Sequence, residues 1–215
     1  MAVYSGSGVH VTSTSAPYSQ IVLRATPTLT ITSNRTTGVY GRSVTFTARV
    51  QPAGATGTVQ FRVDGVAVGS PVTLDATGRA TFVSTTLSVG THQVSFTYSG
   101  NGNFNAATSG NRAYTVTKAS SRAVVRTSGS PAARGTTVTF TATVTAVAPG
   151  SGVPSGTVRF MVDGVLRATV AINASGVATW STTTLTVGRH TVSVAYAGDT
   201  RFVGTTSQTI TQRIQ

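Results

Sequence analysis

Two histidines stand in equivalent settings and are the first candidates for chemistry. His92 follows Gly90 by two residues, and His190 follows Gly188 by two residues. A zinc site needs three or four Cys, His or acidic ligands held close together, yet the chain has no cysteine and no glutamate. We therefore expect neither histidine to bind a metal, and we interpret both as structural residues at a corner of the chain.

The acidic side chains are also too few for a metal or catalytic site. The chain has only four, all aspartates: Asp64, Asp75, Asp163 and Asp199. Calcium sites need several oxygen ligands with at least two carboxylates, and two of these aspartates stand in expected turns. The abundant serines include no G-x-S-x-G nucleophile elbow, and no glycine-rich loop precedes a helix pattern. We expect no catalytic residue, no cofactor and no enzymatic activity.

The composition favours strands over helices. Thr, Val, Ser, Ala and Gly dominate the 215 residues, of which 39% are hydrophobic, so the chain can bury a core. Without cysteine, that core must hold by packing alone. No apolar run approaches the length of a membrane span, and the first residues do not resemble a secretory signal.

The chain contains an internal duplication. Three segments of the first copy return in the same order in the second: residues 44–50 as 138–144, 57–66 as 156–165, and 87–92 as 185–190. The second copy has five extra residues between its first two segments, within residues 149–154. Such a difference in length indicates a surface loop.

Each copy shows the pattern of short antiparallel strands. Apolar and polar residues alternate along residues 44–50 and 59–63, and Asp64-Gly65 between two valines predicts a tight hairpin turn. About seven such strands in roughly 90 residues indicate a Greek-key sandwich. The predicted fold is all-β: an extended N-terminal arm (residues 1–27) followed by two tandem immunoglobulin-like sandwiches (28–118 and 119–215). The expected core residues are Phe46, Phe61, Val94, Phe140, Phe160 and Val192.

The repeated segments resemble a known family. Val44-Thr45-Phe46-Thr47-Ala48, Gly57-Thr58-Val59 and Leu87-Ser88-Val89-Gly90, with their second copies, are similar to the bacterial Ig-like repeats of group 3. This resemblance covers residues 28 to 215. It implies domains that occur in bacterial surface proteins and in phage virion proteins, and it implies no shared active site or ligand.

The arm belongs to neither repeat. We expect short strands at residues 8–12 and 19–24, and a segment this small cannot bury a core of its own. The segment can add as a strand to an exposed sheet edge of a sister subunit or of a larger assembly, or it can complete the sheet of the first sandwich. The side chains expected to dock are Val9, Val11, Tyr18, Ile21, Val22 and Leu23.

The linker between the copies predicts the shape of the molecule. Residues 117–121 contain neither glycine nor proline and form a very short connection. We therefore expect the two sandwiches to sit end to end with limited bending.

These features lead to a functional hypothesis and two alternatives. The hypothesis is a virion surface protein of a phage, made in the host cytoplasm, which decorates the capsid rather than the tail and contacts other virion proteins through residues 1–27. The absence of an export signal favours it. The alternatives are an adhesin or carbohydrate-binding repeat pair from a secreted cell-surface protein, and an accessory domain pair of a secreted hydrolase.

The charge bears on the partners. The net charge of +12 comes almost wholly from arginines spread along the chain without a basic tail. This charge fits either a solvated surface or attraction to an acidic partner, such as an anionic host cell-surface glycopolymer. The expected core position of the aromatic residues argues against specific nucleic-acid binding, and we expect no membrane contact.

Overall fold

The computed structural model describes residues 1–52 and 54–215, and within them it contains strands and no helix. The strands are β1 (Val3–Tyr4), β2 (Ser13–Thr14), β3 (Thr28–Ser33), β4 (Thr37–Val39), β5 (Val44–Gln51), β6 (Thr58–Val63), β7 (Val66–Ala67), β8 (Val72–Thr73), β9 (Arg79–Ser84), β10 (Gly90–Tyr98), β11 (Ala107–Thr108), β12 (Arg112–Thr117), β13 (Ser121–Thr127), β14 (Val138–Ala146), β15 (Thr157–Val162), β16 (Val165–Ala171), β17 (Val177–Thr182), β18 (Gly188–Gly198), β19 (Val203–Thr206) and β20 (Ile210–Ile214).

Strands β3 to β12 form the first sandwich. One sheet has the order β3-β5-β9, and the other has the order β4-β12-β10-β6-β7, with β8 beside β6 and β11 beside β10. The burial pattern of β5 alternates along the strand, as the sequence predicts, because one of its faces meets the second sheet. The pair β4–β12 is parallel, and the other strand pairs of this sandwich are antiparallel.

Strands β13 to β20 repeat this architecture in the second sandwich. The sheet β13-β14-β17 faces the sheet β16-β15-β18-β19, in which β20 also pairs with β18. The contact equivalent to β4–β12 is reduced to one parallel bridge between Ala132 and Ile214. The immunoglobulin-like all-β prediction is therefore confirmed for both copies.

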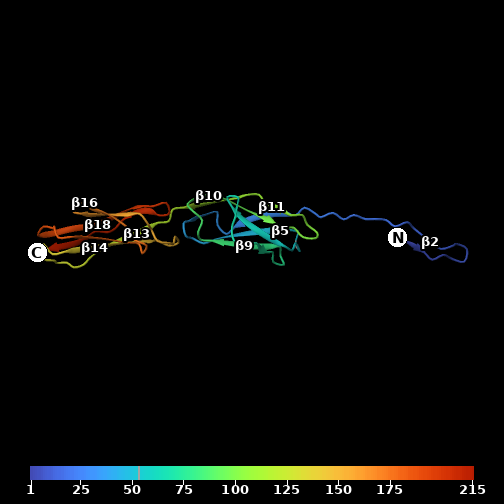
Figure 1. Ribbon diagram of the computed structural model, residues 1–215, viewed down its shortest axis with the longest axis horizontal. Coiled ribbons are helices and arrows are strands. Elements are labelled where there is room, and N and C mark those ends of the chain that lie inside the picture. Colours follow the sequence, from blue (N-terminus) through green and yellow to red (C-terminus); the bar gives the residue numbers. More distant parts are fainter. Residues whose placement is uncertain (53) are drawn as a thin grey trace.

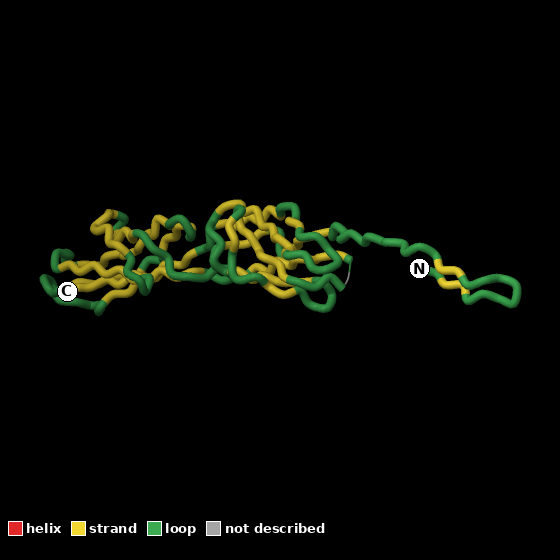
Figure 2. The backbone as a smooth tube through the Cα atoms, turned by 45° about the vertical axis from the view of Figure 1, so that its right-hand side comes forward, coloured by secondary structure: helices red, strands yellow, loops and turns green. Residues whose placement is uncertain are grey.

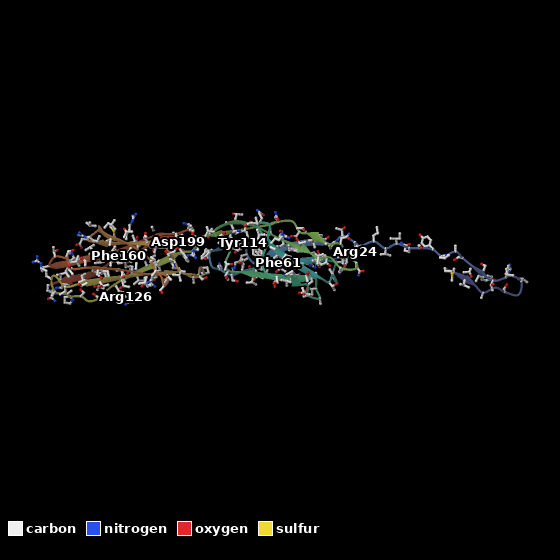
Figure 3. The ribbon with its side chains drawn as sticks, in the orientation of Figure 1. Arg24, Phe61, Tyr114, Arg126, Phe160 and Asp199 are labelled. Carbon is white, nitrogen blue, oxygen red and sulfur yellow. The ribbon has the colours of Figure 1, made fainter. Side chains whose placement is uncertain are left out.

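Each sandwich encloses its own core. The six expected core residues are each at most 1% exposed. In the first sandwich Phe61 packs near Phe82, with ring centroids 5.5 Å apart, and in the second Phe160 lies 5.9 Å from Trp180 in the same arrangement. Figure 3 shows Phe61 and Phe160 inside their two sandwiches. Paired aromatic rings of this kind add to the stability that their buried area provides.

The repeated Asp-Gly turns have the backbone that a type I′ hairpin requires. Asp64 and Gly65 have φ values of 51° and 81°, and Asp163 and Gly164 have 52° and 76°. Aspartate tolerates this left-handed region better than most residues, and glycine adopts it freely. These turns hold β6 against β7 and β15 against β16.

The two sandwiches sit end to end, as the short linker predicts (Figure 1, Figure 2). The N-terminal residues extend from one end of this rod, and the C-terminal residue Gln215 lies at the other end. The molecule therefore presents two separate poles, one next to the arm and one at the free end of the second sandwich.

Candidate functional site

The two histidines are held in the same network in both sandwiches. His92 Nδ1 lies 2.7 Å from Asp64 Oδ2, and its Nε2 lies 2.9 Å from the carbonyl oxygen of Ser88. His190 repeats these contacts, with 2.7 Å to Asp163 and 2.8 Å to the carbonyl of Thr186. Each ring therefore links the end of a hairpin to the loop before β10 or β18, which is a structural role at a corner.

The contacts of His92 also include a hydroxyl, which raises the question of catalysis. Ser88 Oγ lies 3.3 Å from His92 Nε2, while Asp64 binds the other ring nitrogen. A general base needs a free lone pair at Nε2 to accept the hydroxyl proton. Here Nε2 lies closer to the Ser88 carbonyl oxygen, which accepts hydrogen bonds and donates none, so an Nε2 that carries a proton suits this geometry better. The arrangement therefore favours an imidazolium held in place over a base that activates a serine.

The aspartate partners are the part of this network that the sequence analysis missed. Asp64 and Asp163 were assigned to hairpin turns alone, and each also accepts a backbone N–H, from Gln93 and from Thr191. The signal that identifies them is the recurrence of both Asp-Gly and Gly-x-His in each copy, in the same order. Within residues 1–52 and 54–215 no three His, Cys, Asp or Glu side chains gather as a metal site would require.

The histidine corner predicts a pH dependence of stability. The hydrogen bond with Asp163 raises the pKa of His190 above its ordinary value of 6.5, and the hydrogen bond with His190 lowers the pKa of Asp163 below 3.8. The contribution of His190 is thus fully present below pH 6.5 and lost as the pH rises through its folded pKa. The contribution of Asp163 is present above pH 3.8 and lost as the pH falls through its folded pKa.

We expect the free energy of unfolding to fall as the pH rises above 6.5 and through the raised pKa values of the two histidines, and the variant His92→Gln/His190→Gln to lose much of this slope. For His92 burial opposes the charged form, but the hydrogen bonds with Asp64 and the Ser88 carbonyl prevail and raise its pKa. Denaturant unfolding at several pH values measures the slope. The variant His10→Gln, in the arm, is the control. An unchanged slope in the double variant contradicts the prediction.

The joint between the sandwiches is built around Tyr40. Its side chain packs against the core of both sandwiches, and its ring meets Phe202 edge to face with centroids 5.7 Å apart. The guanidinium of Arg201 lies over the Tyr40 ring at 5.4 Å and donates to its hydroxyl at 3.3 Å. Tyr40 thus packs against the hydrophobic cores of both sandwiches and couples them, whereas the linker alone joins them only through the backbone.

The five extra residues of the second copy contribute to the same joint. The sequence analysis assigns residues 149–154 to a surface loop, and the structure shows that this loop contacts the other sandwich. Ser151 Oγ donates to the carbonyl of Gly41 at 2.8 Å, and a side chain at Gly41 would collide with Ser151. Gly41 also has a φ of 79°, which favours glycine. The insertion therefore limits bending between the two sandwiches.

We expect Tyr40→Ala to loosen this joint while both sandwiches stay folded. The substitution removes an edge-to-face aromatic contact and a cation–π contact, which together contribute about 1 kcal/mol or more. Small-angle scattering should show a broader range of interdomain distances. Arg134→Ala is the matched control, because Arg134 is the equivalent residue of the second sandwich and its N–H donates to the carbonyl of Gln215, at the end of the rod away from the joint. Equal scattering curves for wild type and Tyr40→Ala would contradict the role of this residue.

The arm is extended and exposes its apolar side chains. The six side chains expected to dock are each at least 78% exposed. Among the described residues, no backbone N–H from residue 16 to 24 donates a hydrogen bond. Figure 1 shows this segment running away from the first sandwich. Residues 16–24 thus retain unpaired backbone donors next to exposed Ile21, Val22 and Leu23.

The strands that the sequence predicts in the arm are wrong. Residues 8–12 and 19–24 form no strand, and the pairing lies instead between β1 and β2, with Val3 opposite Thr14. Residues 8–12 and 19–24 contain β-branched and apolar residues that favour strands, but a strand also needs a neighbour to pair with. The glycines at residues 6 and 8 place the turn at residues 7–10, so residues 8–12 cannot extend as a strand.

The arm meets the first sandwich at Ala25. Its N–H donates to the carbonyl of Asn103, and its carbonyl accepts from the N–H of Asn105, both at 2.9 Å. Pro27 is buried, whereas Arg24 is exposed where the chain leaves the sandwich (Figure 3). Ala119 in the linker makes the same pair of bonds with the second sandwich. The last three residues of the arm thus contact the first sandwich, and the expected boundary at residue 27 stays a prediction.

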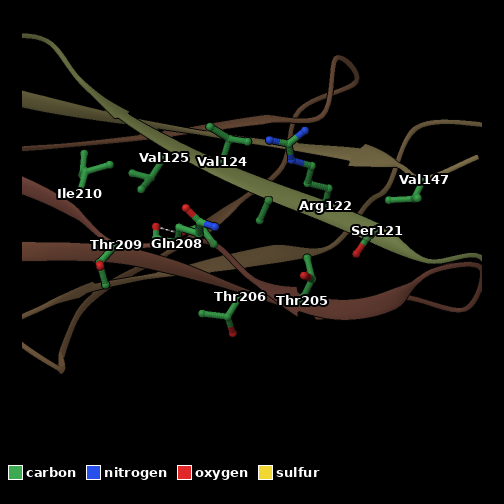
Figure 4. A pocket seen from close by; sticks show the side chains of 12 residues that line it. Ser121, Arg122, Val124, Val125, Val147, Thr205, Thr206, Gln208, Thr209 and Ile210 are labelled. Atoms are coloured by element: carbon green, nitrogen blue, oxygen red, sulfur yellow. Dashed lines mark hydrogen bonds between the residues drawn. The ribbon is translucent and has the colours of Figure 1, made fainter.

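A hollow lies at an open edge of the second sandwich (Figure 4). It has a volume of about 520 Å³ between β13 and residues 205–210. Its walls include Val125, Val147 and Ile210, and Arg122 is its one charged residue. The lining holds no carboxylate and no histidine, so it offers no acid or base for catalysis.

The fold and these sites define a class of protein: tandem immunoglobulin-like β-sandwiches joined as a stiff rod. The family model of the bacterial Ig-like domain (group 3) matches residues 31–117 and 125–215. The chain therefore belongs to this family, and the resemblance seen in the sequence is confirmed. Domains of this fold are typical of structural and adhesion proteins. No curated protein matches the chain.

Solved structures are similar to the chain in fold. A crystal structure of titin domains has a TM-score of 0.52 and 12% identity, and the match covers 87% of this chain and 65% of that one. The adhesin InvE of Yersinia pseudotuberculosis has a TM-score of 0.42 and 18% identity, with 86% and 58% covered. Fibronectin(III)-like modules of Clostridium thermocellum CbhA have a TM-score of 0.33 and 18% identity, with 86% and 93% covered. At these identities the similarity concerns the fold alone. The described residues contain no helix that could cross a membrane.

Proposed function

We propose that the chain is a non-enzymatic structural protein of a phage virion, in which the arm docks on the capsid and the two sandwiches project outward. One observation carries this proposal. A 24-residue segment stands clear of the sandwiches with its apolar side chains exposed, and a segment of this kind needs a partner to bury them. Attachment at one pole of a rod leaves the other pole free.

The mode of docking follows from the backbone of residues 16–24. These residues are extended and their N–H groups are unpaired, so they can add as a strand to an exposed sheet edge of another virion protein. Alternate side chains of a strand point to opposite faces. Ile21 and Leu23 would therefore enter pockets on one face of the partner sheet, while Val22 points to the other.

The rest of the molecule supports a spacer rather than an enzyme. The joint around Tyr40 restrains bending, and the histidine corners hold loops in place. Both features suit a protein that keeps a contact at a fixed distance from a surface.

Membership in the group 3 family favours a second candidate. Such repeats are expected in long surface proteins of bacteria, where the chain would be an adhesin or carbohydrate-binding pair outside the cell. In that case the arm would belong to a connection between repeats, and its docking to a capsid would not occur.

The deciding experiment uses particles assembled without the protein. Full-length chain and a chain that lacks residues 1–23 are added to such particles, and the bound fraction is measured by co-sedimentation. Binding of the full chain and loss of binding on truncation supports the proposal. Absence of binding by the full chain supports the adhesin.

A further inference from the structure

Two arginines lie side by side at the free pole of the second sandwich. Arg189 on β18 and Arg213 on β20 are directly opposite each other in an antiparallel pair, and both are exposed. With Val187, Ile214 and their neighbours they line an open hollow of about 490 Å³, which we call the tip hollow. The hollow includes Gln215, which lies at the end of the rod far from the arm (Figure 1).

The fold does not require arginine at these two positions. In the first sandwich the equivalent residues are Thr91 and Thr115, whose hydroxyls lie 3.0 Å apart and form a hydrogen bond. Two like charges directly opposite each other destabilise a strand pair. The second sandwich thus has a pair of like charges at the position where the first sandwich has a hydrogen-bonded pair of threonines.

No carboxylate of the protein neutralises this pair. In the part of the chain that the structure describes, no side-chain nitrogen of an arginine or lysine lies within 4.0 Å of a carboxylate oxygen, the C-terminal carboxylate included. Asp163, which is bound to His190 on the same strand, is already engaged by that ring and by Thr191. Arg134, whose N–H donates to the carbonyl of Gln215, and Arg167, whose charge acts on His190, are further cations near this pole.

A second opposed arginine pair in the chain has a different environment. Arg49 and Arg79 face each other on β5 and β9. The pKa of Asp75 is lowered chiefly by a hydrogen bond from Thr77, and the charge of Arg79 contributes to the same shift. A carboxylate therefore acts on that pair, whereas the pair at the tip hollow has none.

We propose that Arg189 and Arg213 bind phosphate groups of an anionic polymer at the tip hollow. A guanidinium donates two parallel hydrogen bonds to an oxyanion. A carboxylate has only two oxygens, so one guanidinium is enough to bind both of them. A phosphate group has more acceptor oxygens and, along a polymer, recurs at short intervals, which suits two adjacent guanidiniums. The hollow has no aromatic side chain on which a base could stack, so a polymer without bases fits better than a nucleic acid.

This inference deepens the proposed function, since the tip hollow would be the contact that the docked rod presents to a cell surface. The two proposals are nevertheless independent in experiment. Truncation of residues 1–23 leaves the tip hollow intact and should not change polymer binding in solution. Failure of arm docking and failure of polymer binding are therefore seen in different assays.

The test is calorimetric titration of the full chain with long-chain inorganic polyphosphate at low salt. We expect Arg189→Thr/Arg213→Thr to weaken binding about tenfold or more. The slope of log affinity against log salt concentration should also become shallower, by the amount that corresponds to about two lost phosphate contacts. The matched control is Arg122→Thr/Arg126→Thr. This control removes the same charge, and it likewise introduces the residues found at the equivalent positions of the first sandwich, Thr28 and Thr32. It should change the affinity less than about threefold.

The stability of the variants separates binding from folding. Because the tip variant replaces a like-charge pair by the threonine pair of the first sandwich, its unfolding temperature should not fall. Equal weakening by both double variants, or no binding of polyphosphate by the wild type, overturns the proposal. Tighter binding of duplex DNA than of polyphosphate at equal phosphate concentration also overturns it.

Discussion

Removal of residues 1–23 is expected to abolish attachment to particles while both sandwiches unfold as in the full chain. The truncation leaves Ala25 and its two backbone hydrogen bonds to the first sandwich in place, and it removes only a segment that contributes nothing to either core. Removal of residues 1–27 would also delete those bonds and the buried Pro27, so a lower stability of that longer truncation is expected. Calorimetric melting and co-sedimentation measure the two effects.

Point substitutions make this prediction sharper. Ile21→Asp with Leu23→Asp should weaken attachment strongly, because a charge cannot be buried in an apolar pocket without a partner. Ser19→Asp with Gln20→Asp adds the same charge to the same segment and spares the apolar side chains. Equal binding of both variants would mean that the apolar side chains do not dock.

Phe61→Ala is expected to destabilise the first sandwich by about 3–5 kcal/mol. Phe61 is 1% exposed, and its ring packs between those of Phe82 and Phe96, so truncation leaves a cavity that its neighbours cannot fill. That loss is a large share of the stability of a typical domain. Urea unfolding should therefore show a much earlier transition for the first sandwich.

Strand β9, in the facing sheet, offers the control. Val83 on β9 is 57% exposed, and Val83→Ala should change the free energy of unfolding by no more than about 0.5 kcal/mol. A cost of less than about 1 kcal/mol for Phe61→Ala would contradict the assignment of this ring to a close-packed core.

The fold was largely predictable because its determinants are local in the sequence. Alternation along residues 44–50 identifies a half-buried strand whatever its partners are, and Asp64-Gly65 specifies the hairpin turn between β6 and β7 through backbone preference alone. The duplication then supplies each element twice. The burial of Phe46 and Phe140 follows from the same alternation.

The joint and the corner were not predictable in this way, because they depend on contacts between distant segments. Nothing near Tyr40 in the sequence indicates that its ring meets Phe202, and Ser151 gained its contact only through the insertion. The partnership of Asp64 with His92 joins residues 28 apart. The prediction of strands in the arm was wrong for a related reason: its composition favours strands, but pairing requires a neighbour that the local sequence does not specify.

The parallel pairing of β4 with β12 has a mechanical consequence. Suppose that the arm is anchored and the far pole is bound, so that a pull acts along the rod. The force then enters the first sandwich near its start and leaves through β12, and it slides β4 and β12 past each other. Hydrogen bonds between parallel strands run across the pull and share the load, so they must break together rather than one by one. The second sandwich joins residues 132–134 to residues 213–215 in the same parallel direction, through three backbone hydrogen bonds around the bridge at Ala132, so it should resist the same pull in the same shearing geometry.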